Sequence, residues 1–289
     1  MSDVLYNYSS NEAFLSIIKN RSIWLSSLSS SNDTLEGQIV FRVIEDLAKL
    51  EKMDGKKIND LNDFLYFFQQ YIDNLGLCLS EEGDLLSQWR GYANDGKGMS
   101  IGFSKDYLDR WANDSKSEET KTILALTKTL YNYENILPLI KPLYLDIKKE
   151  IDKGALDEVN FGTILNPKTD EEIEEEKQKY LNKRNKLVIK ALPIINYMYK
   201  IKNEAFKEEK EWRLRTVLLK SENEDCLFRN SNTRIIPYKE MNFPDFNIQI
   251  IKRIYIGPKN DTPIYTIKCL LSKYNFKNVE VKKSKASYR

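Results

Sequence analysis

Residues 4–27 read VLYNYSSNEAFLSIIKNRSIWLSS, and this opening stretch indicates the fold class. Its first five residues, Val4 to Tyr8, form the kind of aromatic and aliphatic run that favours a strand. Ser9 and Glu12 have the spacing of a helix capping box, and apolar residues follow at helical spacing. Residues 22–26 predict a second strand. The chain therefore opens as strand, helix, strand.

The remaining pattern returns to strands near the other end of the chain. Pro237 limits the strand over 233–238 to an edge position at best. Strands at both ends with helices between them predict an α+β fold, with a mixed, mostly antiparallel sheet built from both chain ends. The predicted helices are 35–52, 58–74, 84–93, 104–111 and 262–274, and the predicted strands are 76–80, 97–103, 211–219, 233–238, 248–256 and 278–282.

The middle of the chain, residues 113–207, is highly charged and has helical periodicity. Acidic residues begin a run at Asp170 and basic residues follow from Lys183, which suits a solvated helix whose dipole is complemented at both ends. Pro193 is expected to break or kink this helix. We therefore predict a single domain over residues 1–289, with 113–207 as a helical insertion within it.

Composition excludes several kinds of chemistry. The chain has 289 residues, a net charge of +2 and no histidine. Catalysis by Ser-His-Asp or Cys-His groups and HExxH zinc sites are therefore excluded, and the charge does not favour broad DNA binding. The three cysteines are far apart and form no CxxC pair, so no metal is expected.

The sequence begins without a signal peptide and has no apolar run of membrane-spanning length, which predicts a cytoplasmic protein without a membrane partner.

Residues 91–97 match the first part of a P-loop, but the position that needs Ser or Thr is Gly98. The segment also precedes a predicted strand, whereas a P-loop opens a helix. We interpret Asn94-Asp95-Gly96 as a turn.

The stretch Glu209 to Arg215 alternates in character. If it is extended, Glu209, Glu211, Arg213 and Arg215 share one face, while Trp212 and Leu214 take the opposite, core-facing side. The charged face is either solvated or forms the wall of a cleft. As a cleft, it offers a carboxylate flanked by guanidinium groups, which suits a ligand carrying phosphate and sugar.

Aromatic and small polar residues gather around the first strands. The aromatic residues pack in a core or serve as a stacking platform. The polar residues follow the second strand, and they suit either a binding site or turns and caps. The aromatic set is Tyr6, Tyr8, Trp24, Trp89 and Tyr92, and the polar set is Ser26, Ser27, Asn32 and Asp33.

At these residues the sequence resembles a bacterial family known as domain of unknown function 2971. The matching pieces keep their order along the chain and are sparsest in the helical middle. They are residues 5–10, 23–27, Asn32-Asp33 with Glu36, 78–80, 86–93, 98–103, 209–213, 256–259 and 283–285.

The layout also resembles that of ADP-ribosyltransferases. This similarity implies that the first strand anchors NAD, that the second supplies a serine or tyrosine, and that a late Glu-x-Glu carries the catalytic glutamate. It places Glu211 as the catalytic carboxylate with Glu209 as its partner. At Asn7 the chain departs from the superfamily, which usually has His or Arg in its first motif. The NAD-binding residues implied by the combined matches are Tyr6, Asn7, Tyr8, Ser9, Ser26, Asn32, Asp33, Trp89, Arg90, Tyr92 and Arg213.

The expected function is therefore an NAD-dependent, ADP-ribosyltransferase-like enzyme that modifies protein or nucleic acid. Cleavage of the nicotinamide–ribose bond passes through an oxocarbenium-like state that a carboxylate stabilises, so the reaction needs no histidine. Arg213 or Arg90 would hold the pyrophosphate. The resemblance further implies a toxin or an anti-phage effector. The alternative is a non-catalytic module that binds or senses a nucleotide, peptide or nucleic acid. The oligomeric state is left open.

Overall fold

The computed structural model describes residues 3–31, 35–116, 122–163, 166–220, 225–231, 233–246 and 248–288. The chain divides into two compact units. Unit 1 comprises Met1–Asn32, Asp73–Thr129 and Glu204–Arg289, and unit 2 comprises Asp33–Ile72 and Leu130–Asn203. The single domain with an insertion over 113–207 stays a prediction.

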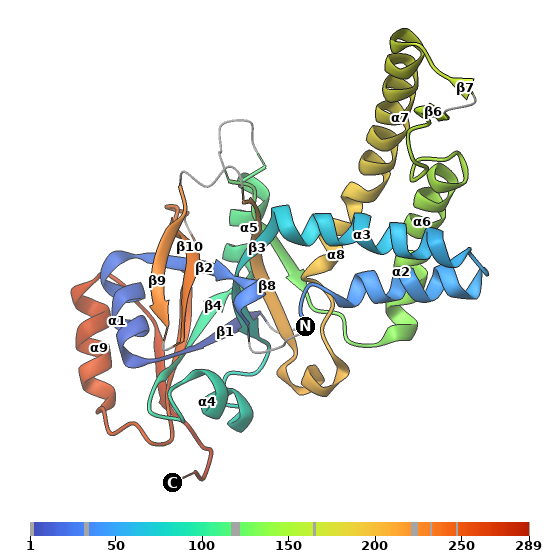
Figure 1. The fold of residues 1–289 in the computed structure, drawn as a ribbon. Helices are drawn as coiled ribbons and strands as arrows, with labels where there is room; N and C mark the ends of the chain where they lie inside the picture. The colour runs from blue at the N-terminus through green and yellow to red at the C-terminus, as the bar shows by residue number, and fades with distance from the viewer. Residues whose placement is uncertain are drawn as a thin grey trace. The chain divides into compact units, whose positions relative to one another are not determined.

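One large sheet organises unit 1, and its strands come from both ends of the chain (Figure 1). The strand order is β12-β11-β4-β1-β3-β2-β10-β9, and β8 pairs with β3 and β5. Among the described strand pairs with a defined register, all are antiparallel except β11 with β12, which confirms a mixed, mostly antiparallel sheet. The strands are β1 (Val4–Ser9), β2 (Ser22–Ser27), β3 (Ile72–Ser80), β4 (Met99–Ser104), β5 (Ala125–Lys128), β8 (Glu211–Leu219), β9 (Leu227–Ser231), β10 (Arg234–Asn242), β11 (Ile251–Ile256) and β12 (Glu280–Lys283).

The main core lies on one side of this sheet, under α1 (Asn11–Asn20), α5 (Lys105–Asp114) and α9 (Ile264–Lys273). Each helix presents its apolar stripe to apolar residues on alternate positions of the strands. Ser104 caps α5 through a hydrogen bond from the amide of Tyr107, as the sequence predicts. The cap of α1 is Ser10 rather than Ser9, with its hydroxyl accepting from the amide of Ala13.

The other side of the sheet carries a smaller cluster around α4 (Leu86–Tyr92). Because side chains alternate along a strand, Tyr6 and Tyr8 project to this side while Leu5 projects into the main core. Trp89 of α4 packs on the two tyrosines. We call the side of the sheet opposite the main core the α4 side.

Unit 2 is helical, as the periodicity predicts. It contains α2 (Ile39–Leu50), α3 (Gly55–Tyr71), α6 (Tyr133–Asp152), α7 (Asp170–Ala191), α8 (Ile195–Met198), the 3-10 turn Leu192–Ile194, and a short hairpin of β6 (Gly162–Thr163) and β7 (Asn166–Pro167). Thr169 and Glu172 form a capping box at the start of α7. The helix ends at Ala191 ahead of Pro193, as expected.

Two local expectations need correction. Strand β3 begins at Ile72, although the sequence predicts helix up to residue 74 and a strand only from 76. Strand β10 pairs with both β2 and β9 and is not an edge strand as a whole. Its register with β2 starts at Tyr238, however, so at Pro237 the strand pairs with β9 alone. The missing N–H therefore falls where β10 has a single neighbour.

Within the described ranges, no helix has both the length and the apolar character needed to cross a membrane.

Candidate functional site

Strand β8 carries a charged pair on the α4 side of the sheet. Trp212 and Leu214 face the main core, so Glu211 and Arg213 project to the opposite side, as the alternation predicts. The Arg213 Nε–Glu211 Oε1 and Arg213 Nη2–Glu211 Oε2 distances are both 2.9 Å. The exposed fractions are 4% for Glu211 and 1% for Arg213. At these two positions the face of β8 is therefore buried rather than solvated.

Arg215 extends the same row of side chains and is also buried. Its Nη1 donates to Asn74 Oδ1 at 2.7 Å, and its Nε donates to Thr127 Oγ1 at 3.3 Å. Burial and the neighbouring charge of Arg213 lower the pKa of Arg215 to about 10.

Glu209 lies just before the strand, in the 3-10 turn Glu204–Glu209, so it is not part of the extended row. Lys210 adopts a left-handed conformation with φ of 44° between the two glutamates. Ser80 Oγ donates to the Glu209 carbonyl at 2.7 Å, and the Tyr92 hydroxyl donates to Glu209 Oε1 at 3.2 Å. The structure thus brings Glu209 together with Tyr92 of α4.

Tyr8 and Trp89 pack against each other on the α4 side. Their ring centroids lie 4.9 Å apart in an edge-to-face arrangement, and Trp89 is 0% exposed. The Tyr8 hydroxyl donates to the Glu82 carbonyl at 2.8 Å and accepts from the Leu85 amide at 2.9 Å. Burial raises the pKa of Tyr8 well above its ordinary value, so this group is a neutral hydroxyl at physiological pH.

Other predicted site residues lie elsewhere. Alternation along β1 places Asn7 and Ser9 with Leu5 on the main-core side, away from Tyr8. Asn7 Nδ2 donates to the Cys78 carbonyl at 3.0 Å, and Ser9 Oγ is buried with no hydrogen-bond partner among the described residues. Asn32 and Asp33 lie outside the described residues.

Three further predicted residues lie on or beside the α4 side. Tyr6 accepts a hydrogen bond from Arg253 Nη1 at 2.9 Å, which ties it to β11. Arg90 is exposed, with its guanidinium over the ring of Tyr288. Ser26 accepts from Arg229 Nε at 3.2 Å, farther along the sheet.

The sequence reading missed Asp84, which connects α4 to the last segment of the chain. Its carboxylate accepts from Trp89 Nε1 at 2.7 Å, Ser284 Oγ at 2.5 Å and the Lys285 amide at 2.7 Å. The sequence did offer one indication, because residues 283–285 are among the pieces that resemble the family, and Ser284 and Lys285 are the residues that donate to Asp84.

The predicted turn at Asn94-Asp95-Gly96 is confirmed, since the three residues have φ of 48°, 54° and 81°. Among the described residues, no group of three or more His, Cys, Asp or Glu side chains is placed to hold a metal ion.

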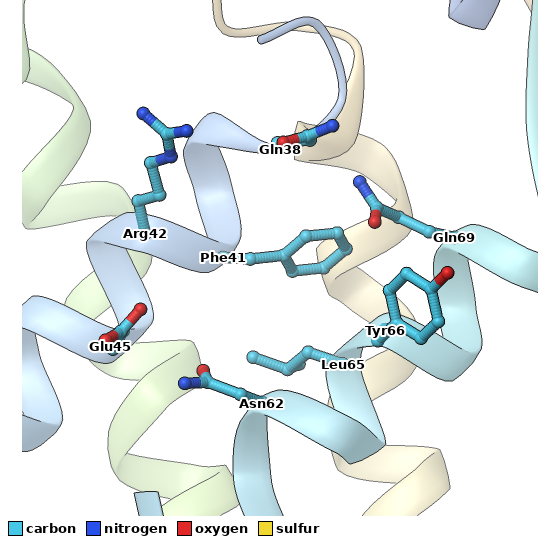
Figure 2. A pocket seen from close by; sticks show the side chains of 8 residues that line it. All are labelled: Gln38, Phe41, Arg42, Glu45, Asn62, Leu65, Tyr66 and Gln69. Atoms are coloured by element: carbon cyan, nitrogen blue, oxygen red, sulfur yellow. The ribbon is translucent and has the colours of Figure 1, made fainter. Parts of the chain in front are cut away.

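Unit 2 has a separate hollow of about 160 Å³ between α2 and α3. Figure 2 shows Phe41 and Leu65 between the two helices, with polar side chains around them and Arg42 extending away. None of the predicted site residues lines it. The lining residues are Gln38, Phe41, Arg42, Glu45, Asn62, Leu65, Tyr66 and Gln69.

Residues 88–214 match the model of a family described as Protein of unknown function (DUF2971). The DUF2971 match covers under half of the chain, and it includes Trp89, Tyr92, Glu209, Glu211 and Arg213. It is the same family that the sequence motifs resemble. No curated protein and no solved structure matches the chain significantly.

Proposed function

We propose that this chain is an NAD-dependent, ADP-ribosyltransferase-like enzyme with its reaction centre at the start of β8. The observation that supports this most is the position of Glu209 and Glu211 on either side of Lys210, with Glu209 bonded to Tyr92 on α4. Two carboxylates and a tyrosine hydroxyl are groups that bind ribose hydroxyls and stabilise positive charge on a sugar.

The proposed reaction breaks the bond between the ribose C1′ and the nicotinamide nitrogen. Nicotinamide leaves with the electron pair of that bond, which neutralises its own positive charge. A nucleophilic atom of a protein or nucleic acid then bonds to C1′ and loses its proton to solvent. The carboxylate of Glu211, which accepts two hydrogen bonds from Arg213, would stabilise the sugar cation.

One observation favours the alternative of a binding or sensing module without catalysis. Arg213 pairs with Glu211 through two hydrogen bonds, and both side chains are buried. A carboxylate that is already paired with a guanidinium gives less stabilisation to a sugar cation. In this second function the same face would bind a nucleotide, a peptide or a nucleic-acid end without breaking a bond.

The deciding experiment incubates the full chain with labelled NAD, a cell lysate and nucleic acid, and measures nicotinamide release and label transfer. The proposal expects nicotinamide release that falls by about 10²–10³-fold in a folded Glu211→Gln or Glu209→Gln variant. No release and no transfer with any target would overturn the enzyme and leave the binding module. Growth inhibition on expression, relieved by the same variants, would extend the proposal to a toxin or an anti-phage effector.

A further inference from the structure

Strands β2, β10 and β9 carry a second constellation on the α4 side of the sheet. Ser26 lies opposite Tyr238 in the register between β2 and β10, and Trp24 lies opposite Glu240. Arg229 of β9 lies opposite Ile236 of β10. Ile236 is two residues before Tyr238, so Arg229 and Tyr238 lie on the same side of the sheet. Strand β2 and the consecutive strands β9 and β10, which are far from β2 in the sequence, thus place a serine, two aromatic rings and a guanidinium together.

The aromatic pair is partly open to solvent. The rings of Trp24 and Tyr238 are stacked, with centroids 4.4 Å apart and an interplanar angle of 30°. Tyr238 is 9% exposed, whereas Trp24 remains 38% exposed. Its neighbours Ile23 and Leu25 are fully buried in the main core. The large exposed surface of Trp24 is available for stacking with another ring.

Arg229 is half-buried, and its partners differ from those of Arg213 and Arg253. Arg213 and Arg253 each pair with a glutamate. The guanidinium of Arg229 instead donates from Nε to Ser26 Oγ at 3.2 Å, and no carboxylate in the described part of the chain pairs with it. Its Nη groups therefore remain available as donors to an anion. Burial lowers the pKa of Arg229, which reflects the cost of holding this charge without a counter-ion.

We propose that Arg229, Ser26, Trp24 and Tyr238 form a subsite for a nucleoside phosphate. The fork of Arg229 would bind the phosphate, since a guanidinium matches two phosphate oxygens. The exposed ring of Trp24 would stack with the base. Ser26 fixes the guanidinium through Nε, which leaves the Nη donors for the ligand.

The positions of a carboxylate at one end of the subsite and a guanidinium at the other give the bound nucleotide one orientation. Glu240 lies opposite Trp24 and accepts from Ser22 Oγ at 2.6 Å. It is four residues from Ile236, the partner of Arg229, which is about 13 Å along an extended strand. The carboxylate repels phosphate at the Trp24 end, so the phosphate binds at the Arg229 end. The subsite rests on the proposed function only in the identity of the nucleotide, which would then be NAD with its pyrophosphate on Arg229 rather than on Arg213 or Arg90.

The test measures binding of ADP, NAD, adenosine and a short single-stranded oligonucleotide by calorimetry, without any turnover. We expect ADP and NAD to bind and adenosine to bind at least about tenfold more weakly, because it lacks the phosphate. Arg229→Gln should weaken ADP binding by about tenfold or more, and Arg229→Lys by less. Trp24→Leu should weaken ADP and adenosine by similar factors.

The matched control is Arg234→Gln, an exposed arginine of β10 that donates to the Ser30 carbonyl. It should leave binding unchanged, and thermal melts should show that all variants remain folded. Binding of ADP without NAD cleavage keeps the subsite and overturns the enzyme. If the Arg229→Gln variant cleaves NAD with an unchanged KM, the enzyme is kept and the subsite is overturned. No ADP binding to the wild type, equal binding by Arg229→Gln, or binding of the oligonucleotide alone overturns the subsite.

Discussion

Glu211 and Arg213 project from the same side of β8 and form two parallel hydrogen bonds, each 2.9 Å long. A guanidinium and a carboxylate in this arrangement have the strongest geometry that an ion pair of these groups adopts. Both side chains are almost fully removed from solvent. Breaking the pair therefore leaves a charge where water cannot compensate for it.

Glu211→Gln is expected to destabilise unit 1 by about 3–5 kcal/mol, because the buried ion pair between Arg213 and Glu211 is broken. On a protein of this size, such a loss lowers the Tm by roughly 10 °C. A thermal melt followed by circular dichroism measures this. The activity of the variant is interpretable only at temperatures where the melt shows it folded.

The matched control is Glu280→Gln, which removes an exposed carboxylate that pairs with Arg253. Its cost should stay below about 1 kcal/mol, as for other surface pairs. The double variant Glu211→Leu with Arg213→Met should recover most of the lost stability, because neither charge is then buried. A melt of Glu211→Gln that coincides with the wild type would show that the pair is not buried in solution.

The local pattern predicts much of unit 1. The opening strands, the Ser104 cap and the bounds of β8 follow from alternation, capping residues and Pro or Gly signals, which act over a few residues. The start of β3 does not follow from them. Asp73 and Asn74 read as the polar end of a helix, yet they are buried in the sheet.

Long-range partners explain the difference. Asp73 Oδ2 accepts from Ser27 Oγ at 2.5 Å, and Asn74 Oδ1 accepts from Arg215 Nη1 at 2.7 Å. These partners lie 46 and 141 residues away in the sequence. Local sequence pattern also fails to predict parts of the site. The hydrogen bonds of Asp84 with Ser284 and of Arg229 with Ser26 join residues far apart in the sequence, which only the folded sheet brings close together.

Acid should weaken unit 1 partly through Glu81. Burial alone would raise the pKa of this carboxyl, but hydrogen bonds from Lys128 Nζ and Trp212 Nε1, at 2.6 and 2.8 Å, outweigh it and lower the pKa below its ordinary value of 4.5. The stabilisation is therefore present above about pH 4.5 and is lost as the pH falls through the lower, folded-state pKa. Between pH 5 and pH 3 the Tm should fall more steeply in the wild type than in Glu81→Gln. Parallel curves would exclude Glu81 as a contributor.

Asp84→Asn should loosen the segment 284–288. The carboxylate accepts three hydrogen bonds, and an amide supplies a single uncharged oxygen in its place. We expect a loss of about 1–3 kcal/mol and faster hydrogen exchange in residues 284–288. Asp95→Asn is the control, because Asp95 is exposed and also bonds this segment, through the Tyr288 hydroxyl at 2.6 Å. An equal effect of the two variants would contradict the central role of Asp84.

Lys210→Gly separates the geometry of the site from its stability. Lys210 has a φ of 44°, which costs a residue with a Cβ about 1–2 kcal/mol. Glycine removes that strain but makes the unfolded chain more flexible, so the net gain over Lys210→Ala should be about 0.5–1 kcal/mol. Alanine is the right reference because both variants lose the exposed ion pair of Lys210 with Glu82.

If the left-handed turn serves to aim Glu209 and Glu211, the glycine variant should release nicotinamide more slowly than the alanine variant although it is more stable. Melts and NAD turnover on the same two samples measure both quantities. Equal turnover would show that this backbone conformation has no role in positioning the two carboxylates.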